Sequence, residues 1–178
     1  MASTKALLTV GTVLIVSGVI GIGLATPAPE DGRVTSGTEA PDFSAFTLDE
    51  PAATRTLADY EGDVVLLNIW ATWCHPCVEE MPTMQTAWES YADRGFRVVA
   101  ISVDDAGAED LIREFRDEYG LTFDILHDPA WATFDAYQIN GVPATFLIDR
   151  EGTIRLTRFA ANWTSEENRS EIEKLLDD

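Results

Sequence analysis

Cys74 and Cys77 are the residues of this 178-residue chain whose type and spacing most clearly indicate chemistry, and the chain has no other cysteine. One pair cannot build the disulfide framework that stabilises small secreted domains. The two lie three positions apart, so a bond between them would close a very short loop and would remove little entropy from the unfolded chain. Redox chemistry or metal binding therefore explains the pair better than structural stabilisation does.

The sequence around the pair, WCHPC at positions 73–77, favours a site at the start of a helix. Residues three apart on a helix have β-carbons about 5–6 Å apart, and a modest rotation then brings two sulfur atoms within bonding range. Pro76 suits the first turn, where its missing N–H costs nothing. Cys74 would face unpaired backbone N–H groups and the positive end of the helix dipole, and both favour a thiolate.

We therefore expect Cys74 to be the attacking thiolate and Cys77, one turn further on and more buried, to be the resolving thiol. Lowering the pKa of a thiol from about 8.5 to about 6.5 takes roughly 2.7 kcal/mol, whereas a helix terminus supplies about 2 kcal/mol at most. The remainder must come from hydrogen bonds and from neighbours such as His75. A closed zinc site needs four ligands, and only His75 and His127 could join the cysteines, so we expect no metal.

The elements that must position this pair are a buried strand before it and an amphipathic helix after it. Residues 64–70 form a short apolar run, which is typical of a strand buried on both faces. Apolar residues then recur every three or four positions over 76–91, which predicts a helix with Pro82 inside it. Similar patterns predict strands at 96–103, 123–126, 144–149 and 153–159 and helices at 109–119, 130–137 and 165–176. This order predicts an α/β sandwich around a mixed sheet.

The N-terminal part of the chain has the composition of a membrane anchor followed by a linker. Residues 6–25 carry no charge and follow Lys5, and a helix of about 20 residues spans the hydrocarbon core of a bilayer. The positive-inside tendency places residues 1–5 in the cytoplasm and the domain outside. Residues 26–38 are rich in Pro, Gly and Thr and predict a linker, and residues 39–178 form the domain. Cleavage after the apolar segment would instead give a secreted protein.

The charge of the chain is strongly negative, with 31 acidic against 12 basic residues and a formal net charge of -19. Nucleic acid is excluded as a partner, because phosphate binding needs clustered lysine and arginine. Such a charge repels itself at low salt, and molar salt would screen it. We therefore expect a halophilic source.

Two stretches of the chain resemble the thioredoxin superfamily, most of all its membrane-tethered TlpA/ResA-like branch: NIWATWCHPC at 68–77 with EMP at 80–82, and GVPATFLID at 141–149. The resemblance covers residues 39–178 and implies a thioredoxin-like three-layer sandwich with helices on both faces of the sheet, in which 109–119 is an inserted helix. It also implies that Pro143 is a cis-proline facing the cysteine pair. A substrate chain would then meet the surface made by Trp73, His75, Pro76, Val142 and Pro143.

Two positions depart from thioredoxin itself and bear on the mechanism. Thioredoxin has a buried aspartate where this chain has Asn68, which cannot exchange a proton. In the tethered branch a glutamate three residues after the second cysteine takes a similar place, and Glu80 matches it. We therefore expect Glu80 to accept the proton of Cys77, since a partly buried carboxylate has a raised pKa. The second departure is the dipeptide between the cysteines, in which a cationic His75 would favour the Cys74 thiolate and make the pair more oxidising.

Together these features predict a thiol–disulfide oxidoreductase outside the cytoplasm, whose redox group is the Cys74–Cys77 pair and which needs no other cofactor. The resemblance implies protein substrates with disulfides or thiols, including those of cytochrome c maturation, and electrons from a membrane partner, because no nicotinamide or flavin motif is present. The same residues would serve a disulfide-forming oxidant, since the reduction potential alone separates the two, within about −270 to −120 mV. A Cu(I)-binding chaperone on this fold would require one more residue between the cysteines. A peroxidase of the peroxiredoxin type would require a lone cysteine, so both alternatives fit the sequence less well.

Overall fold

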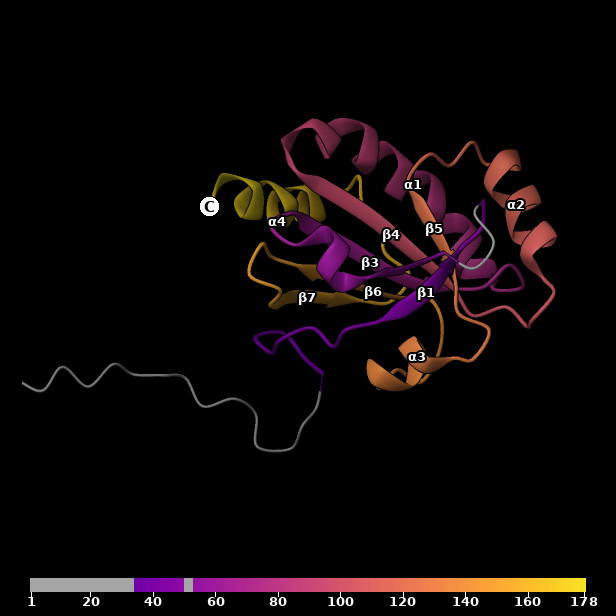
Figure 1. Ribbon diagram of the computed structural model, residues 1–178. Coiled ribbons are helices and arrows are strands. Elements are labelled where there is room, and N and C mark those ends of the chain that lie inside the picture. Colours follow the sequence, from indigo (N-terminus) through magenta and orange to yellow (C-terminus); the bar gives the residue numbers. More distant parts are fainter. Residues whose placement is uncertain (1–33, 50–52) are drawn as a thin grey trace, which may run out of the picture.

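The computed structural model describes residues 34–49 and 53–178, which form a seven-stranded sheet covered by helices (Figure 1). The strands are β1 Ser44–Thr47, β2 Thr54–Thr56, β3 Val64–Trp70, β4 Phe96–Ser102, β5 Asp124–His127, β6 Ala144–Ile148 and β7 Ile154–Arg158. The α-helices are α1 His75–Tyr91, α2 Glu109–Glu118, α3 Ala132–Ala136 and α4 Glu166–Asp177, and the 3-10 helices are η1 Leu57–Tyr60 and η2 Ala92–Arg94.

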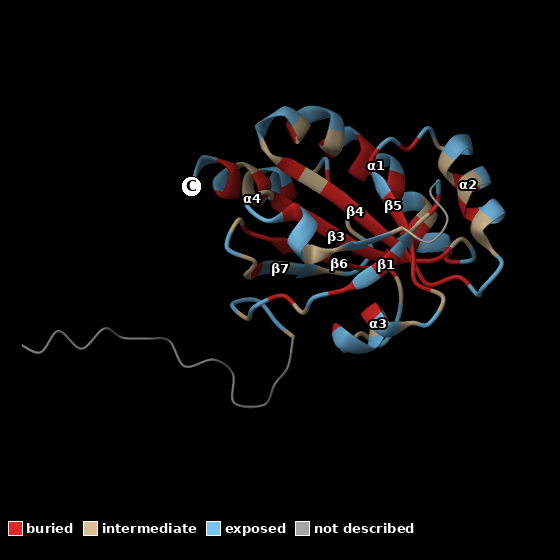
Figure 2. Cartoon of the chain, viewed as in Figure 1, coloured by how far each residue is buried: buried red, intermediate tan, exposed pale blue. Residues whose placement is uncertain are grey.

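The sheet is mixed, as the sequence predicts, with the strand order β2-β1-β5-β4-β3-β6-β7. Strands β3, β4 and β5 run parallel, whereas β6, β7 and the β1–β2 pair are antiparallel to their neighbours. All seven residues of β3 are buried, and the buried part of the chain in Figure 2 is centred on β3 and β4. Burial on both faces explains why the sequence of β3 is apolar throughout instead of alternating.

Alternate residues of β6 show which helices cover which face of the sheet. Thr145 points to α1, where its hydroxyl donates to Glu80, whereas the ring of Phe146 packs against Tyr137, just after α3, with centroids 4.8 Å apart. Successive side chains of a strand point to opposite faces. Helices α1, α2 and α4 thus lie on one face and α3 on the other, which confirms a thioredoxin-like α/β arrangement (Figure 1).

Among the helices and strands, the main differences from the sequence prediction lie in the short elements β1, β2 and α3. Strands β1 and β2 are not predicted, because they are only four and three residues long and Ala45 is their one buried residue. The helix expected at 130–137 is shorter and begins after Trp131, whose left-handed φ of 61° excludes it from the helix. The longer elements, which carry strong apolar patterns, agree to within a residue or two.

The linker expected at 26–38 is described from residue 34 onwards, and this part is hydrogen-bonded to the sheet. The Gly37 N–H donates to the Ile154 carbonyl at 2.7 Å, and the Ile154 N–H donates to the Thr38 carbonyl at 2.9 Å. Gly37 and Thr38, at the end of the stretch predicted to be a linker, thus already contact the open edge of β7, which offers them backbone partners. The anchor expected at 6–25 lies outside the described residues. None of the helices within 34–49 and 53–178 is both long and apolar enough to cross a membrane.

Candidate active site

Cys74 and Cys77 form a disulfide where the chain passes from β3 into α1. Their Cα atoms are 5.3 Å apart. Cys74 is the N-cap residue of α1, and its sulfur accepts a hydrogen bond from the Cys77 backbone N–H at 3.3 Å. Both cysteines are buried, and Cys77 has no exposed surface. After reduction the same N–H group is in place to stabilise a Cys74 thiolate, as the position at the helix start predicts.

The residues beside the buried disulfide are themselves exposed to solvent. Trp73 is 62% exposed, and Pro76 in the first helical turn is exposed as well. The imidazole of His75 is 87% exposed, and its Nε2 lies 3.6 Å from a carboxylate oxygen of Glu79. His75 therefore faces solvent and an acidic neighbour one turn along α1, and the structure gives it no hydrogen bond to Cys74.

The Val142–Pro143 bond is cis, and its place in the sheet brings it to the cysteine end of the molecule. Ala144, the first residue of β6, pairs with Ile69 near the end of β3, directly before the turn to α1. Pro143 itself is buried and Val142 is half-buried. The two stretches that carry the family resemblance thus meet where β3 ends and β6 begins, although about 70 residues separate them along the chain.

Glu80 is a buried carboxyl three residues after the second cysteine, and it is only 2% exposed. Its Oε1 accepts hydrogen bonds from three donors, namely Trp163 Nε1 at 2.7 Å, Thr145 Oγ1 at 2.9 Å and the Ala161 backbone N–H at 3.3 Å. Its Oε2 has one long contact with the Asn68 amide nitrogen at 3.5 Å. Glu80 therefore lies in the interior and is not an exposed residue of α1.

Burial raises the pKa of Glu80 above the ordinary value for glutamate. The hydrogen bonds from Trp163, Thr145, Ala161 and Asn68 act in the opposite direction, because each of them favours the ionised form. A carboxyl with a raised pKa is a stronger base once it is ionised, and this suits an exchange of protons with a thiol.

The partners of Glu80 are the part of the site that the sequence did not reveal. Thr145 lies in the matching stretch at 141–149, and its register opposite Asn68 follows once β3 and β6 are paired. Trp163 carries no comparable signal, because it lies between β7 and α4 and is 83 residues away from Glu80 in the chain. Asn68 is buried, and its amide donates to the Thr145 hydroxyl at 2.7 Å.

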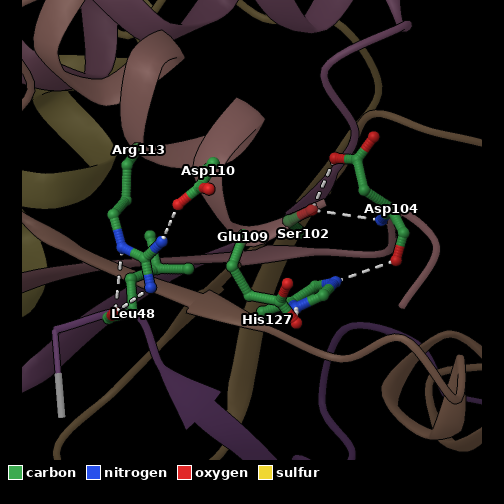
Figure 3. A network of polar contacts seen from close by, with 7 residues as sticks. All are labelled: Leu48, Ser102, Asp104, Glu109, Asp110, Arg113 and His127. Atoms are coloured by element: carbon green, nitrogen blue, oxygen red, sulfur yellow. Dashed lines mark hydrogen bonds and ion pairs between the residues drawn. The ribbon is translucent and has the colours of Figure 1, made fainter. Parts of the chain in front are cut away.

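A second buried carboxylate, Asp104, holds the loop that leads into the cysteines. Its two oxygens accept the Thr72 backbone N–H at 3.0 Å and the Thr72 hydroxyl at 2.7 Å. The Ser102 hydroxyl donates to the same carboxylate at 2.6 Å (Figure 3). Thr72 lies two positions before Cys74, so Asp104 ties the end of β4 to the residues that lead into Cys74.

His127 belongs to this neighbouring cluster and not to the cysteine pair. It is buried at the end of β5, and its Nε2 lies 2.9 Å from the Asp104 carbonyl while its Nδ1 lies 3.5 Å from Glu109 (Figure 3). A hydrogen bond to a carbonyl requires the proton on Nε2. Within the described residues, no three His, Cys, Asp or Glu side chains are grouped so that they could hold a metal ion.

Comparisons with known proteins agree with this geometry. The sequence profile of the AhpC/TSA family matches residues 36–157. The thiol-disulfide oxidoreductase ResA of Oceanobacillus iheyensis is 38% identical over 144 residues, which is 79% of this chain and 74% of that protein. The thioredoxin-like protein YneN of Bacillus subtilis is 40% identical over 131 residues, which is 73% of this chain and 75% of that protein.

Among solved structures, one from Chlorobium tepidum described as a thiol:disulfide interchange protein DsbE superposes with a TM-score of 0.72. It is 32% identical in sequence, and the match covers 80% of this chain and 99% of that one. The paired cysteines at the helix start, the cis-proline at the same end of the strands and these relatives lead to the same conclusion. The chain belongs to the AhpC/TSA family and is a thiol–disulfide oxidoreductase of the TlpA/ResA-like, thioredoxin-fold kind.

Proposed function

We propose that the protein reduces protein disulfides outside the cytoplasm, and that residues 6–25 anchor it to the membrane. A membrane partner would supply the electrons, and the Cys74–Cys77 pair would be the redox group. The uncharged N-terminal segment supports the location, as does the likeness to a secreted thiol-disulfide isomerase of Corynebacterium glutamicum, which has a TM-score of 0.70 at 27% identity. The relatives named ResA and DsbE make an oxidised apocytochrome c the first substrate to test.

The proposed reaction has two exchanges of sulfur partners. The Cys74 thiolate attacks one sulfur of the substrate disulfide, and the other sulfur leaves as a thiolate, so that Cys74 and the substrate form a mixed disulfide. Glu80 then takes the proton of Cys77, and the Cys77 thiolate attacks the Cys74 sulfur. The substrate leaves with two electrons gained, and the enzyme pair is oxidised. The exposed surface at Trp73, His75 and Pro76, with Val142 and Pro143 beside it, would receive the substrate chain.

The observation that carries the direction of electron flow is the environment of His75. A cation beside Cys74 would stabilise the reduced, thiolate form and would make the pair oxidising. The His75 side chain is almost fully exposed and lies 3.6 Å from the Glu79 carboxylate. Solvent screening and this opposite charge weaken any effect of His75 on the Cys74 sulfur. His75 is therefore poorly placed to raise the potential of the pair, which favours a reductase over a disulfide-forming oxidant.

The test is the reduction potential of the pair, equilibrated in glutathione or dithiothreitol buffers at high salt. We expect a value near or below about −250 mV, and a value near −150 to −120 mV would assign the protein to disulfide formation instead. The variant His75→Ala should shift the potential by less than about 30 mV, which corresponds to a tenfold change in the equilibrium constant. A pair that forms no disulfide at any poise would rule out the redox function.

A further inference from the structure

The two oxygens of the Glu80 carboxyl are held very differently. Each oxygen of an ionised carboxylate has about two lone-pair sites for hydrogen bonds. Oε1 accepts three hydrogen bonds, from Trp163, Thr145 and Ala161. Oε2 has only the 3.5 Å contact with Asn68. Oε1 is therefore saturated and has no site left for a proton, whereas Oε2 has a free one.

Trp163 makes the shortest of the three bonds to Oε1, and the structure fixes it firmly to the same turn of α1. Its indole N–H donates to Oε1 at 2.7 Å, and its backbone N–H donates to the Thr83 hydroxyl at 3.1 Å. That hydroxyl in turn donates to the backbone carbonyl of Glu80 at 2.8 Å. Trp163 has no exposed surface, and an indole N–H can only donate. The ring is thus a rigid donor that cannot accept a proton from Glu80.

We propose that Trp163 is a positioning residue for proton transfer, which saturates Oε1 together with Thr145 and Ala161 so that Oε2 exchanges the proton with Cys77. This inference rests on the proposed role of Glu80 and adds which of its two oxygens takes the proton. Cys77 lies three residues before Glu80 on α1, so the two side chains share one face of the helix.

The step conserves atoms and charge. The S–H bond of Cys77 breaks, and an O–H bond forms at Oε2 of Glu80. The Cys77 thiolate attacks the Cys74 sulfur of the mixed disulfide, and the bond from Cys74 to the substrate sulfur breaks. The substrate sulfur leaves with the electron pair as a thiolate, and the proton on Oε2 passes to solvent. The residues that contact the Glu80 carboxyl in the described structure are Asn68, Thr145, Ala161 and Trp163, and none of them is charged.

The experiment follows the release of substrate from the mixed disulfide as a function of pH. The reduced protein is mixed in a stopped-flow instrument with a chromogenic aromatic disulfide. The first coloured thiolate is released as Cys74 is capped, and the second is released as Cys77 attacks. The pH midpoint of the second phase reports the ionisation of the group that takes the Cys77 proton.

In Trp163→Phe we expect this midpoint to move up by about one to two pH units, because the carboxylate loses a hydrogen bond of the charge-assisted kind. On the acid side of the midpoint the second phase should slow by about ten- to a hundredfold. Trp70→Phe is the matched control, because Trp70 is also fully buried while its indole N–H has no hydrogen-bond partner in the described structure. An unchanged midpoint in Trp163→Phe, or an equal shift in Trp70→Phe, would overturn the inference.

Two further variants keep the test decisive. Thr145→Val removes another donor to Oε1 and should move the midpoint in the same direction, so it replaces Trp163→Phe if that variant does not fold. Glu80→Gln separates this inference from the proposed function. A second phase in Glu80→Gln with the parent rate and pH profile would refute the role of Glu80 itself. If Glu80→Gln loses the pH dependence while Trp163→Phe keeps the parent midpoint, only the role of Trp163 fails.

Discussion

Replacing Asp104 with alanine should loosen the loop before Cys74 and lower the reactivity of that thiol. The Asp104 carboxylate accepts two hydrogen bonds from Thr72 and one from Ser102, at 2.6 to 3.0 Å. Without it, the turn between β3 and α1 loses its tie to β4. The Cys74 sulfur is then held less firmly at the position where it accepts the Cys77 N–H at 3.3 Å.

The size of the effect follows from these contacts. A hydrogen bond to a charged group contributes about 1.5–3 kcal/mol, but water can reach the half-buried Thr72 once Asp104 is removed. Ser102 has no exposed surface, so water cannot replace the hydrogen bond that its hydroxyl loses. We therefore expect Asp104→Ala to lower the free energy of unfolding by about 2–4 kcal/mol. Loss of the cap hydrogen bond at Cys74, about 1 kcal/mol, should slow its alkylation at neutral pH about fivefold.

The assay combines urea unfolding of the oxidised protein with the pH profile of iodoacetamide alkylation of the reduced protein. Asp149→Ala is a matched control at the opposite end of the sheet. Asp149 is buried and accepts the backbone N–H groups of Glu151 at 3.2 Å and Thr153 at 2.7 Å. It should lose stability without a change in the alkylation profile of Cys74. A normal profile in Asp104→Ala, or the same slowing in both variants, would refute the idea that Asp104 positions the attacking thiol.

Three more outcomes follow from the structure and the composition. Glu80 has a raised pKa in the folded state, so the folded protein binds more protons than the unfolded chain between the two pKa values, and its stability falls as pH rises through this window. Glu80→Gln should therefore gain stability relative to the parent as pH rises from about 4 to neutral, by urea unfolding; a difference that is constant with pH contradicts this. The net charge of -19 should make refolding stability rise from low to multimolar salt, and equal stability at both would argue against a halophilic source. Ser165 caps α4 by accepting the Asn168 N–H at 3.4 Å, so Ser165→Ala should lower the unfolding free energy by about 0.5–1 kcal/mol without changing thiol chemistry.

The parts of the fold that the sequence predicts are those in which local pattern and tertiary burial agree. Strand β3 coincides with the apolar run at 64–70, and α1 begins one residue before the predicted start. The helix predicted at 165–176 is α4, and its predicted first residue, Ser165, is the N-cap. Strands β1 and β2 could not be predicted, because their pairing with β5 and with each other, and not their own sequence, makes them strands.

In the candidate site, too, some features can be predicted from the local sequence and others depend on the folded sheet. The helix start and the cysteine pair follow from the sequence pattern, and Glu80 follows from the family resemblance; all three lie at the start of α1. The donors to Glu80 come from β6 and from the segment before α4, and only the folded sheet brings them together. His127 lies one residue past the strand predicted at 123–126, yet it is the last residue of β5 and is buried, with its ring bonded to the Asp104 carbonyl.

The pairing of residues 34–38 with β7 has a consequence for how the domain can be presented to a partner. Gly37 lies beside Ile154, the first residue of β7, whereas the last residue of that strand, Arg158, pairs with Thr145 near the cysteine end. The chain thus joins the sheet along the half that is more distant from Cys74. A force applied to the chain before residue 34 would therefore act on the start of β7, at the end of the sheet opposite the cysteines. The end of the domain that carries Cys74 would then remain accessible to binding partners.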